Sequence, residues 1–148
     1  MHSYRVLVRK VVDLGAAITE ALDFLLYDFT GKHVWVKPNL LGPHRPERSV
    51  TTDPELVRHV TRELKRRRAS AVWVADNPMG VHSELLADFL APTGVVEASE
   101  GCFRDIAESS VLVPLKSRFA AEVPVSSILN EVDVIVNLPV SRPTHSPS

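Results

Sequence analysis

The sequence has little cysteine, no excess of either charge and no long apolar run, and each shortage excludes a class of protein. Cys102 is the only cysteine among 148 residues, so neither an iron–sulfur cluster nor a four-cysteine zinc site can form within this chain alone. Lysine and arginine total 17 against 18 aspartates and glutamates, a balance that disfavours a nucleic-acid-binding module. No stretch approaches the roughly 18 apolar residues of a membrane span, and no signal-peptide core is present. We therefore expect a cytoplasmic protein without nucleic-acid or membrane partners.

What the chain does contain is typical of a globular domain. Hydrophobic residues make up 45% and charged residues 24%, which is enough to build a core without disulfides or metals. Residues 1–140 are predicted to form a single domain. The last eight residues, 141–148, have prolines and serines but no apolar anchor, and we expect them to be disordered. No histidine pair has a recognised metal-ligand spacing, so no metal site is predicted and the cofactor stays unknown.

The order of apolar runs and helical stripes predicts an α/β fold. The expected strands are 4–12, 33–37, 71–75 and 132–136, and the expected helices are 14–29, 54–68 and 83–90. Residues 95–107 have a mixed pattern that suggests helix around Phe103 and Ile106, and 126–131 suggests one helical turn. Short β-rich runs at 111–113 and 121–125 suggest a paired set. The alternation predicts a mostly parallel sheet with helices on both faces, a Rossmann-like three-layer arrangement.

The clearest helix start is Thr52-Asp53-Pro54-Glu55. Thr52 and Glu55 have capping-box spacing, whereas Asp53 before Pro54 has the pattern of an N-cap followed by proline at the first helical position. A residue before proline avoids the helical region, and an N-cap must be non-helical. Asp53 is therefore the predicted cap.

Polar side chains follow three of the predicted strands. The strand ends read Lys37-Pro38-Asn39, Asp76-Asn77-Pro78 and Asn137-Leu138-Pro139. Parallel strands about 4.8 Å apart would bring these ends within about 10 Å, outside the carboxyl edge of the sheet. We predict a site there for a small anionic ligand, with Lys37 supplying charge and Asp76 an acid, a base or a metal contact. The alternative interpretation is that asparagine and proline simply end the strands.

The loop between residues 38 and 52 extends this hypothesis. Thr51 and Thr52 precede the helix that begins near Asp53, and free N–H groups at a helix start can bind an anion. Asn39, Thr51, Thr52, Asn77 and Asn137 are accordingly the predicted ligand-binding residues, beside the candidate catalytic pair Asp76 and Lys37. No phosphate-binding or dinucleotide-binding glycine motif supports this assignment. A solvated loop is the competing interpretation.

Four segments together resemble one protein family. VWVKPNLLGP, TTDPELVRHVTRELK, AVWVADNP and VDVIVNLPV are similar in order and spacing to the family called domain of unknown function 362. The resemblance implies an α/β fold. Some members of that family join this domain to cysteine clusters and are described as iron–sulfur proteins, so the resemblance implies at most a redox or metabolic setting.

The chain departs from that family's pattern near its end. Family members usually continue further, and a Lys-Thr-His type motif typically follows the last strand, whereas this chain reads Val140-Ser141-Arg142-Pro143-Thr144-His145 and then stops. We therefore expect the domain to be incomplete at its C-terminus. A non-catalytic interaction module, or a fragment of an iron–sulfur-associated protein, is the alternative to a ligand-binding domain. A second copy or a C-terminal partner segment would then cover an exposed sheet edge.

Overall fold

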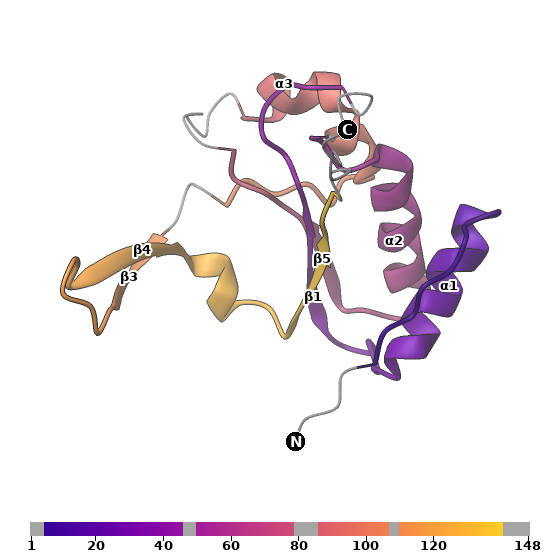
Figure 1. Cartoon of the computed structure of the whole chain (residues 1–148), viewed down its shortest axis with the longest axis horizontal. Coiled ribbons are helices and arrows are strands. Elements are labelled where there is room, and N and C mark those ends of the chain that lie inside the picture. The colour runs from indigo at the N-terminus through magenta and orange to yellow at the C-terminus, as the bar shows by residue number, and fades with distance from the viewer. Residues whose placement is uncertain (1–4, 46–49, 79–85, 107–109, 141–148) are drawn as a thin grey trace, which may run out of the picture.

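A three-stranded parallel sheet organises the chain. The computed structural model describes residues 5–45, 50–78, 86–106 and 110–140. Its elements are shown in Figure 1 and follow the order α1 (Leu14–Leu25), β1 (His33–Pro38), α2 (Pro54–Arg66), β2 (Ala71–Val74), α3 (Leu86–Leu90), the 3₁₀-helix η3 (Ala91–Thr93), α4 (Val95–Ala98), β3 (Ser110–Pro114), β4 (Glu122–Ser126), the 3₁₀-helix η4 (Ser127–Asn130) and β5 (Val134–Leu138).

The strand order is β2–β1–β5, with β1 in the centre. Trp35 of β1 is level with Trp73 of β2 on one side and Ile135 of β5 on the other. Both pairings are parallel, so the three carboxyl ends meet at one edge. The α/β fold with a mostly parallel, Rossmann-like sheet is thereby confirmed, and the adjacency of the three predicted strands is observed.

Side chains alternate between the two faces of this sheet because successive residues of a strand point in opposite directions. Val34 and Val36 pack in one cluster with α2 residues such as Leu64, and we call this side the α2 face. Trp35 packs in a separate cluster with Ile128 of η4, and we call this side the η4 face. In Figure 1 the two long helices lie on one side of the sheet and η4 on the other.

Local capping determines where the two long helices begin. Asp13 accepts a hydrogen bond from the backbone N–H of Ala16 at 2.6 Å and caps α1. Asp53 accepts one from the backbone N–H of Glu55 at 2.8 Å, so the predicted cap of α2 is confirmed. The predicted helix 14–29 ends early, because Leu26 adopts a left-handed conformation with φ of 53°. Within the described ranges no helix is long and apolar enough to cross a membrane.

Three sequence-based assignments are wrong. Residues 5–12 form no strand; they run along α1, where Arg9 pairs with Glu20 and Arg5 stacks on Phe24. The last strand covers 134–138 rather than 132–136, because its pairing with β1 continues through Leu138. The segment 103–106 is not helical; Phe103 forms a parallel bridge to Val74 at the edge of β2.

Other assignments are confirmed or lie outside the described residues. Strands β3 and β4 pair antiparallel, with Val111 level with Val125, and η4 is the predicted turn of helix. Of the helix predicted at 83–90, residues 86–90 are helical, and its first residues lie outside the described ranges. So does the tail expected at 141–148.

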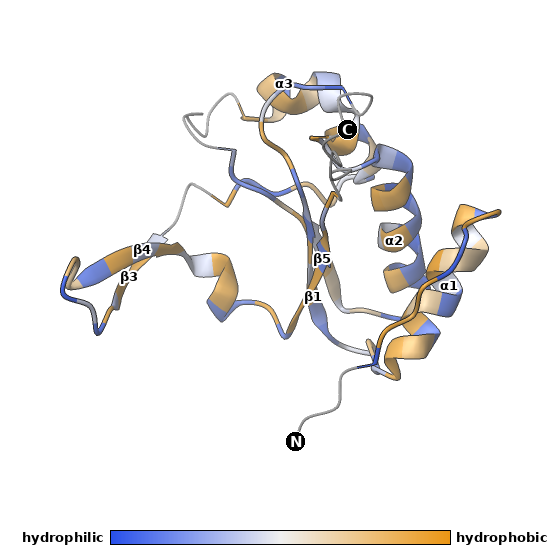
Figure 2. Ribbon diagram, viewed as in Figure 1, coloured by the Kyte–Doolittle hydropathy of each residue, from blue (hydrophilic) through white to orange (hydrophobic). Residues whose placement is uncertain are grey.

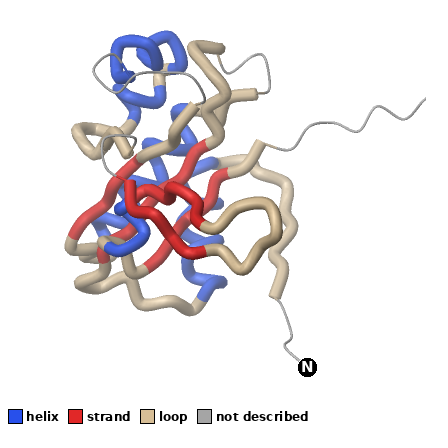
Figure 3. The backbone as a smooth tube through the Cα atoms, turned by 90° about the vertical axis from the view of Figure 1, so that its left-hand side faces the viewer, coloured by secondary structure: helices blue, strands red, loops and turns tan. Residues whose placement is uncertain are grey.

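The β3–β4 hairpin projects from the rest of the molecule as an arm. It lies apart from the parallel sheet in Figure 1 and carries apolar stretches in Figure 2; in Figure 3, where the left-hand side of Figure 1 faces the viewer, the hairpin points toward the viewer. All five residues of β3 are exposed, and Leu112 and Phe119 are 64% and 83% exposed. The hairpin therefore adds little to the core.

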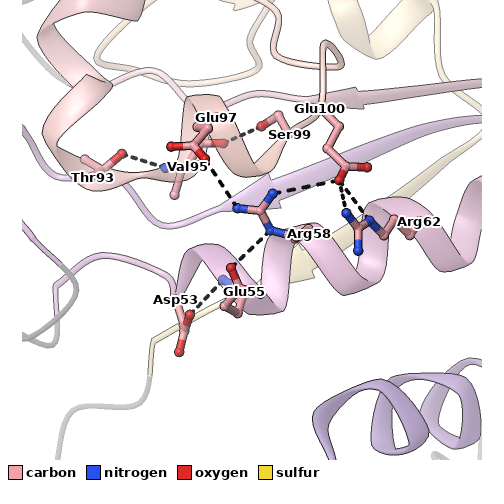
Figure 4. Close-up of polar contacts among 9 residues, drawn as sticks. All are labelled: Asp53, Glu55, Arg58, Arg62, Thr93, Val95, Glu97, Ser99 and Glu100. Atoms are coloured by element: carbon pink, nitrogen blue, oxygen red, sulfur yellow. Dashed lines mark hydrogen bonds and ion pairs between the residues drawn. The ribbon is translucent and has the colours of Figure 1, made fainter.

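Charged side chains fasten α4 to α2 (Figure 4). Arg58 of α2 contacts Glu97 of α4 at 3.9 Å and Glu100, just after α4, at 3.8 Å, and Arg62 donates to Glu100 at 2.8 Å. The Arg62 hydrogen bond lowers the pKa of Glu100 below its ordinary value. These exposed pairs orient the α4 turn, while apolar residues such as Val95 fill the core beneath it.

Candidate functional site

The carboxyl ends of β1, β2 and β5 bring together four of the predicted site residues, which we call the rim: Lys37, Asp76, Asn77 and Asn137. Lys37 belongs to β1 and Asn137 to β5, and the two are register partners. Asp76 follows β2 by two residues. The parallel topology thus places the three predicted strand ends at a single edge.

Lys37 and Asp76 contact each other directly. The Lys37 Nζ lies 3.0 Å from the Asp76 Oδ1, and the two side chains are 38% and 13% exposed. The other carboxylate oxygen of Asp76 accepts the backbone N–H of Leu40 at 2.7 Å. Asp76 is therefore held in place from the loop that follows β1, and it in turn positions the lysine.

The ammonium of Lys37 has capacity left for a further partner. An ammonium has three donor hydrogens, one of which is directed to Asp76. Its only other described acceptor is the Pro38 carbonyl at 3.5 Å, at the outer limit of hydrogen-bond distance. With the side chain 38% exposed, a ligand oxygen can approach it from solvent.

Asn137 extends the rim on the η4 face. It is level with Lys37 on the neighbouring parallel strand, so both side chains leave the same face of the sheet. Its side chain is exposed and, like that of Asn77, hydrogen-bonds to no residue within the described ranges. Both amides can donate to or accept from a ligand.

Thr52 and Asn39 instead bind the protein itself. The Thr52 hydroxyl donates to the Leu138 carbonyl at 2.8 Å and accepts the Asn39 N–H at 2.8 Å. The Asn39 side-chain amide donates to the Val50 carbonyl at 2.8 Å. These bonds join the end of β1, the end of β5 and the start of α2, which explains why polar residues occupy these positions.

Thr51 has a similar internal role. Its hydroxyl donates to the His44 carbonyl at 2.8 Å, and its backbone forms an antiparallel bridge with Leu40. Thr51 and Thr52 are only 3% and 1% exposed. The structure thus separates the predicted ligand residues into an accessible group on the rim and a buried group that shapes the loop.

One contributor to this site could not be recognised from the sequence. The Leu40 N–H that holds Asp76 is a backbone group, and any residue except proline would supply it. Within the described ranges there is also no group of three histidine, cysteine, aspartate or glutamate side chains that could hold a metal ion. The chemistry available at the rim is therefore a cation, a carboxylate and two amides.

A family model matches residues 34–146, from β1 through the rim to beyond β5, and its description is domain of unknown function (DUF362). The chain belongs to the DUF362 family. The resemblance seen in the strand-end segments is confirmed, and all four rim residues lie within the matched region. Neither a curated protein nor a solved structure gives a significant match.

Proposed function

We propose that this DUF362 domain binds a small anionic metabolite, a carboxylate or a phosphate, at the rim. The observation that carries the proposal is the Lys37–Asp76 contact of 3.0 Å beside an exposed amide on the neighbouring strand. A half-exposed lysine with an uncommitted donor supplies the charge. Asn137 and Asn77 supply hydrogen bonds.

Asp76 has two effects on such a ligand. Its carboxylate holds the lysine in a defined place, and its charge opposes that of an incoming anion. The rim would therefore favour a ligand that also presents a donor, such as a hydroxyl or an amine, to Asp76. A hydroxy acid or an amino acid would meet both charges of the pair, and a proton transferred during a reaction would pass to or from one of these two groups.

Titration calorimetry with inorganic phosphate and with lactate tests the proposal. Lys37→Gln keeps a hydrogen-bond donor for Asp76 but removes the charge, and binding of both anions should weaken about tenfold. Lys116→Gln is the matched control, because Lys116 is an exposed lysine in the β3–β4 turn. The Lys116→Gln variant should bind both anions with the affinity of the wild-type protein.

Asp76→Asn separates the two roles of the carboxylate. The asparagine oxygen can still accept the Leu40 N–H, while the repulsion of an anion is lost. Phosphate binding should tighten several-fold, and the preference for lactate over propionate, which lacks the hydroxyl, should disappear. If Lys37→Gln and Asp76→Asn both bind these anions as the wild-type protein does, the anion site is not at the rim.

A second candidate function, a non-catalytic interaction module, is supported by the exposed apolar hairpin. Leu112 and Phe119 are mostly exposed on an arm that stands away from the core, and exposed apolar patches are typical of interaction surfaces. Sedimentation of the wild-type chain and of a Leu112→Ser, Phe119→Ser double variant tests it. A wild-type chain that sediments as a dimer, with a double variant that sediments as a monomer, would support this function. A wild-type chain that is monomeric at all concentrations would contradict self-association.

A further inference from the structure

A second, chemically different hollow lies on the α2 face. A partly open cavity of about 630 Å³ is lined by α1, the N-terminal segment 5–12, the start of α2 and the end of β5. Its volume is within the range of about 300–1,000 Å³ that small-molecule sites occupy. Leu56 and Val60 line it from α2, and Val136 and Leu138 line it from β5. We call it the α1 cavity.

The α1 cavity is long and almost wholly apolar. Its lining extends along α1 from Leu14 to Leu25, a distance of about 16 Å at the rise of an α-helix. Arg5 and Arg9 are the only lining residues that are not apolar. An extended hydrocarbon chain matches this shape better than a compact polar metabolite does.

The two arginines differ in their partners. Arg9 forms an ion pair with Glu20 of α1. Arg5 stacks on Phe24, with its guanidinium carbon 4.3 Å from the ring centroid, and no carboxylate of the described residues lies within ion-pair distance of it. Because Phe24 is in the last turn of α1, Arg5 places an uncompensated cation at one end of the cavity.

The N-terminal segment covers the cavity without being tied to the sheet. Within the described ranges, residues 5–12 form no backbone hydrogen bond to another segment. Val6 and Val8 are 77% and 87% exposed, so these side chains contribute little to holding the segment down. A ligand could enter by displacing this segment without breaking the core.

We propose that the α1 cavity binds a single-chain anionic amphiphile, a long-chain carboxylate, with its hydrocarbon chain along α1 and its head group on Arg5. The charge complementarity of Arg5 and the elongated apolar lining favour this occupant over a neutral or cationic one. The proposal does not depend on anion binding at the rim, because the two sites share no residue.

Calorimetric titration of the full chain with three probes of equal chain length tests the charge and the shape together. Dodecanoate, dodecanol and dodecyltrimethylammonium are used below their aggregation concentrations. Dodecanoate should bind saturably at one site, about tenfold more tightly than dodecanol, and the cationic probe should bind most weakly. Decanoate should bind roughly fifteenfold more weakly than dodecanoate, since it lacks two methylenes and each buried methylene contributes about a fourfold factor.

Arg5→Gln is the decisive variant, and the hairpin offers its control. Arg118 stacks on Phe119 at 4.6 Å, a comparable arginine–aromatic contact far from the cavity lining. Arg5→Gln should bring dodecanoate affinity down to that of dodecanol, whereas Arg118→Gln should leave it unchanged. Equal losses in the two variants, or none in Arg5→Gln, would overturn the proposal.

Ala21→Phe tests the cavity itself, because Ala21 lines it from α1. This variant should lose saturable dodecanoate binding while its circular dichroism spectrum and thermal midpoint stay near those of the wild-type protein. If Ala21→Phe does not fold, displacement of a bound fluorescent fatty acid by dodecanoate from the wild-type chain, but not from Arg5→Gln at the same concentration, locates the site instead. Absence of saturable binding to the wild-type chain would overturn the proposal. So would a dimer that persists in the Leu112→Ser, Phe119→Ser double variant and that dodecanoate fails to dissociate, because a second copy would then occupy the cavity.

Discussion

The two faces of the sheet are built very differently. On the α2 face, 14 buried residues of the described ranges form one cluster, and α2 contributes Val57 and Leu64 at 0% exposure. On the η4 face, only four buried residues of the same ranges form a cluster, and Ile135 remains 44% exposed. The thinly covered face is also the one from which Lys37 and Asn137 emerge. The buried apolar residues that stabilise the fold are therefore mostly on the α2 face, and the accessible polar side chains of the rim are on the η4 face.

The largest expected effect separates the two clusters directly. Leu64→Ala removes a fully buried side chain from the α2 face and should lower the free energy of unfolding by about 4 kcal/mol. Ile128→Ala, in the smaller cluster, should lower the free energy of unfolding by about 2 kcal/mol. The loss is smaller because the residues around Ile128 can close over the vacated space or water can enter it. Urea denaturation measures both, with Ile135→Ala as the exposed control at about 0.5 kcal/mol. Equal losses at Leu64 and Ile128 would refute the contrast between the faces.

The next effect concerns the junction at the carboxyl edge. Thr52→Val removes the hydroxyl that bonds both Leu138 and Asn39 and leaves buried polar groups without partners, which should cost about 2 kcal/mol. Thr52→Ser keeps the hydroxyl and should recover most of that loss. A chemical-denaturation series compares the two. If Thr52→Val leaves the free energy of unfolding unchanged, the hydroxyl does not stabilise this junction.

A second buried threonine should respond in the opposite direction. Thr61 of α2 is 0% exposed, and its hydroxyl oxygen has no hydrogen-bond partner among the described residues. Thr61→Val replaces this hydroxyl with a methyl group of similar shape, so the free energy of unfolding should rise by about 0.5 kcal/mol. The same denaturation assay measures it. A loss above about 1 kcal/mol would show that the α2 face is not a purely apolar core at this point.

The smallest expected effect is a difference in how the free energy of unfolding depends on pH. It compares two carboxylates, Glu63 of α2 and Glu131 beside η4. The Arg66 hydrogen bond, assisted by Arg67, lowers the pKa of Glu63, and the Arg104 hydrogen bond lowers the pKa of Glu131. A carboxyl group whose pKa is lower in the folded state stabilises the protein above its unfolded pKa, near 4.5. That stabilisation is lost as the pH falls through the folded value.

Glu63→Gln should therefore reduce the acid-induced loss of stability more than Glu131→Gln does. Glu63 is the less exposed of the two, at 10% against 37% for the side chain, and solvent screens it less. Unfolding curves at intervals from pH 7 to pH 3 give the comparison. If the free energy of unfolding of the two variants depends on pH in the same way, the less exposed carboxylate does not stabilise the protein more than the exposed one.

Local sequence signals predicted much of the fold. Asp13 and Asp53 were recognisable as caps because a cap depends on a side chain and the two or three residues after it. The β-rich run around Trp35 indicated a strand, and the run around Trp73 indicated a strand of a parallel sheet, since an apolar run without alternation is typical of one. The segment 5–12 was misassigned because its alternating pattern is the same whether it pairs with a strand or lies along a helix.

The candidate site was predictable in part for the same reason. The sequence placed Lys37, Asp76 and Asn137 after apolar runs, and parallel pairing then brought them to one edge. It could not show that the hydroxyls of Thr51 and Thr52 are used internally, because their acceptors are backbone carbonyls far along the chain. Nor could it show the Leu40 N–H that holds Asp76.

By itself, the sequence determined the helix starts, the central strands and the residue types at their ends, because these depend on contacts between near neighbours. Only the tertiary structure decided the register of β5, the division of the polar residues into buried supports and an exposed rim, and the apolar cavity beneath α1. These features depend on the packing of elements up to 100 residues apart, as in the bond between the His33 N–H and Asp133. The local sequence pattern does not indicate which residues so far apart in the chain come into contact.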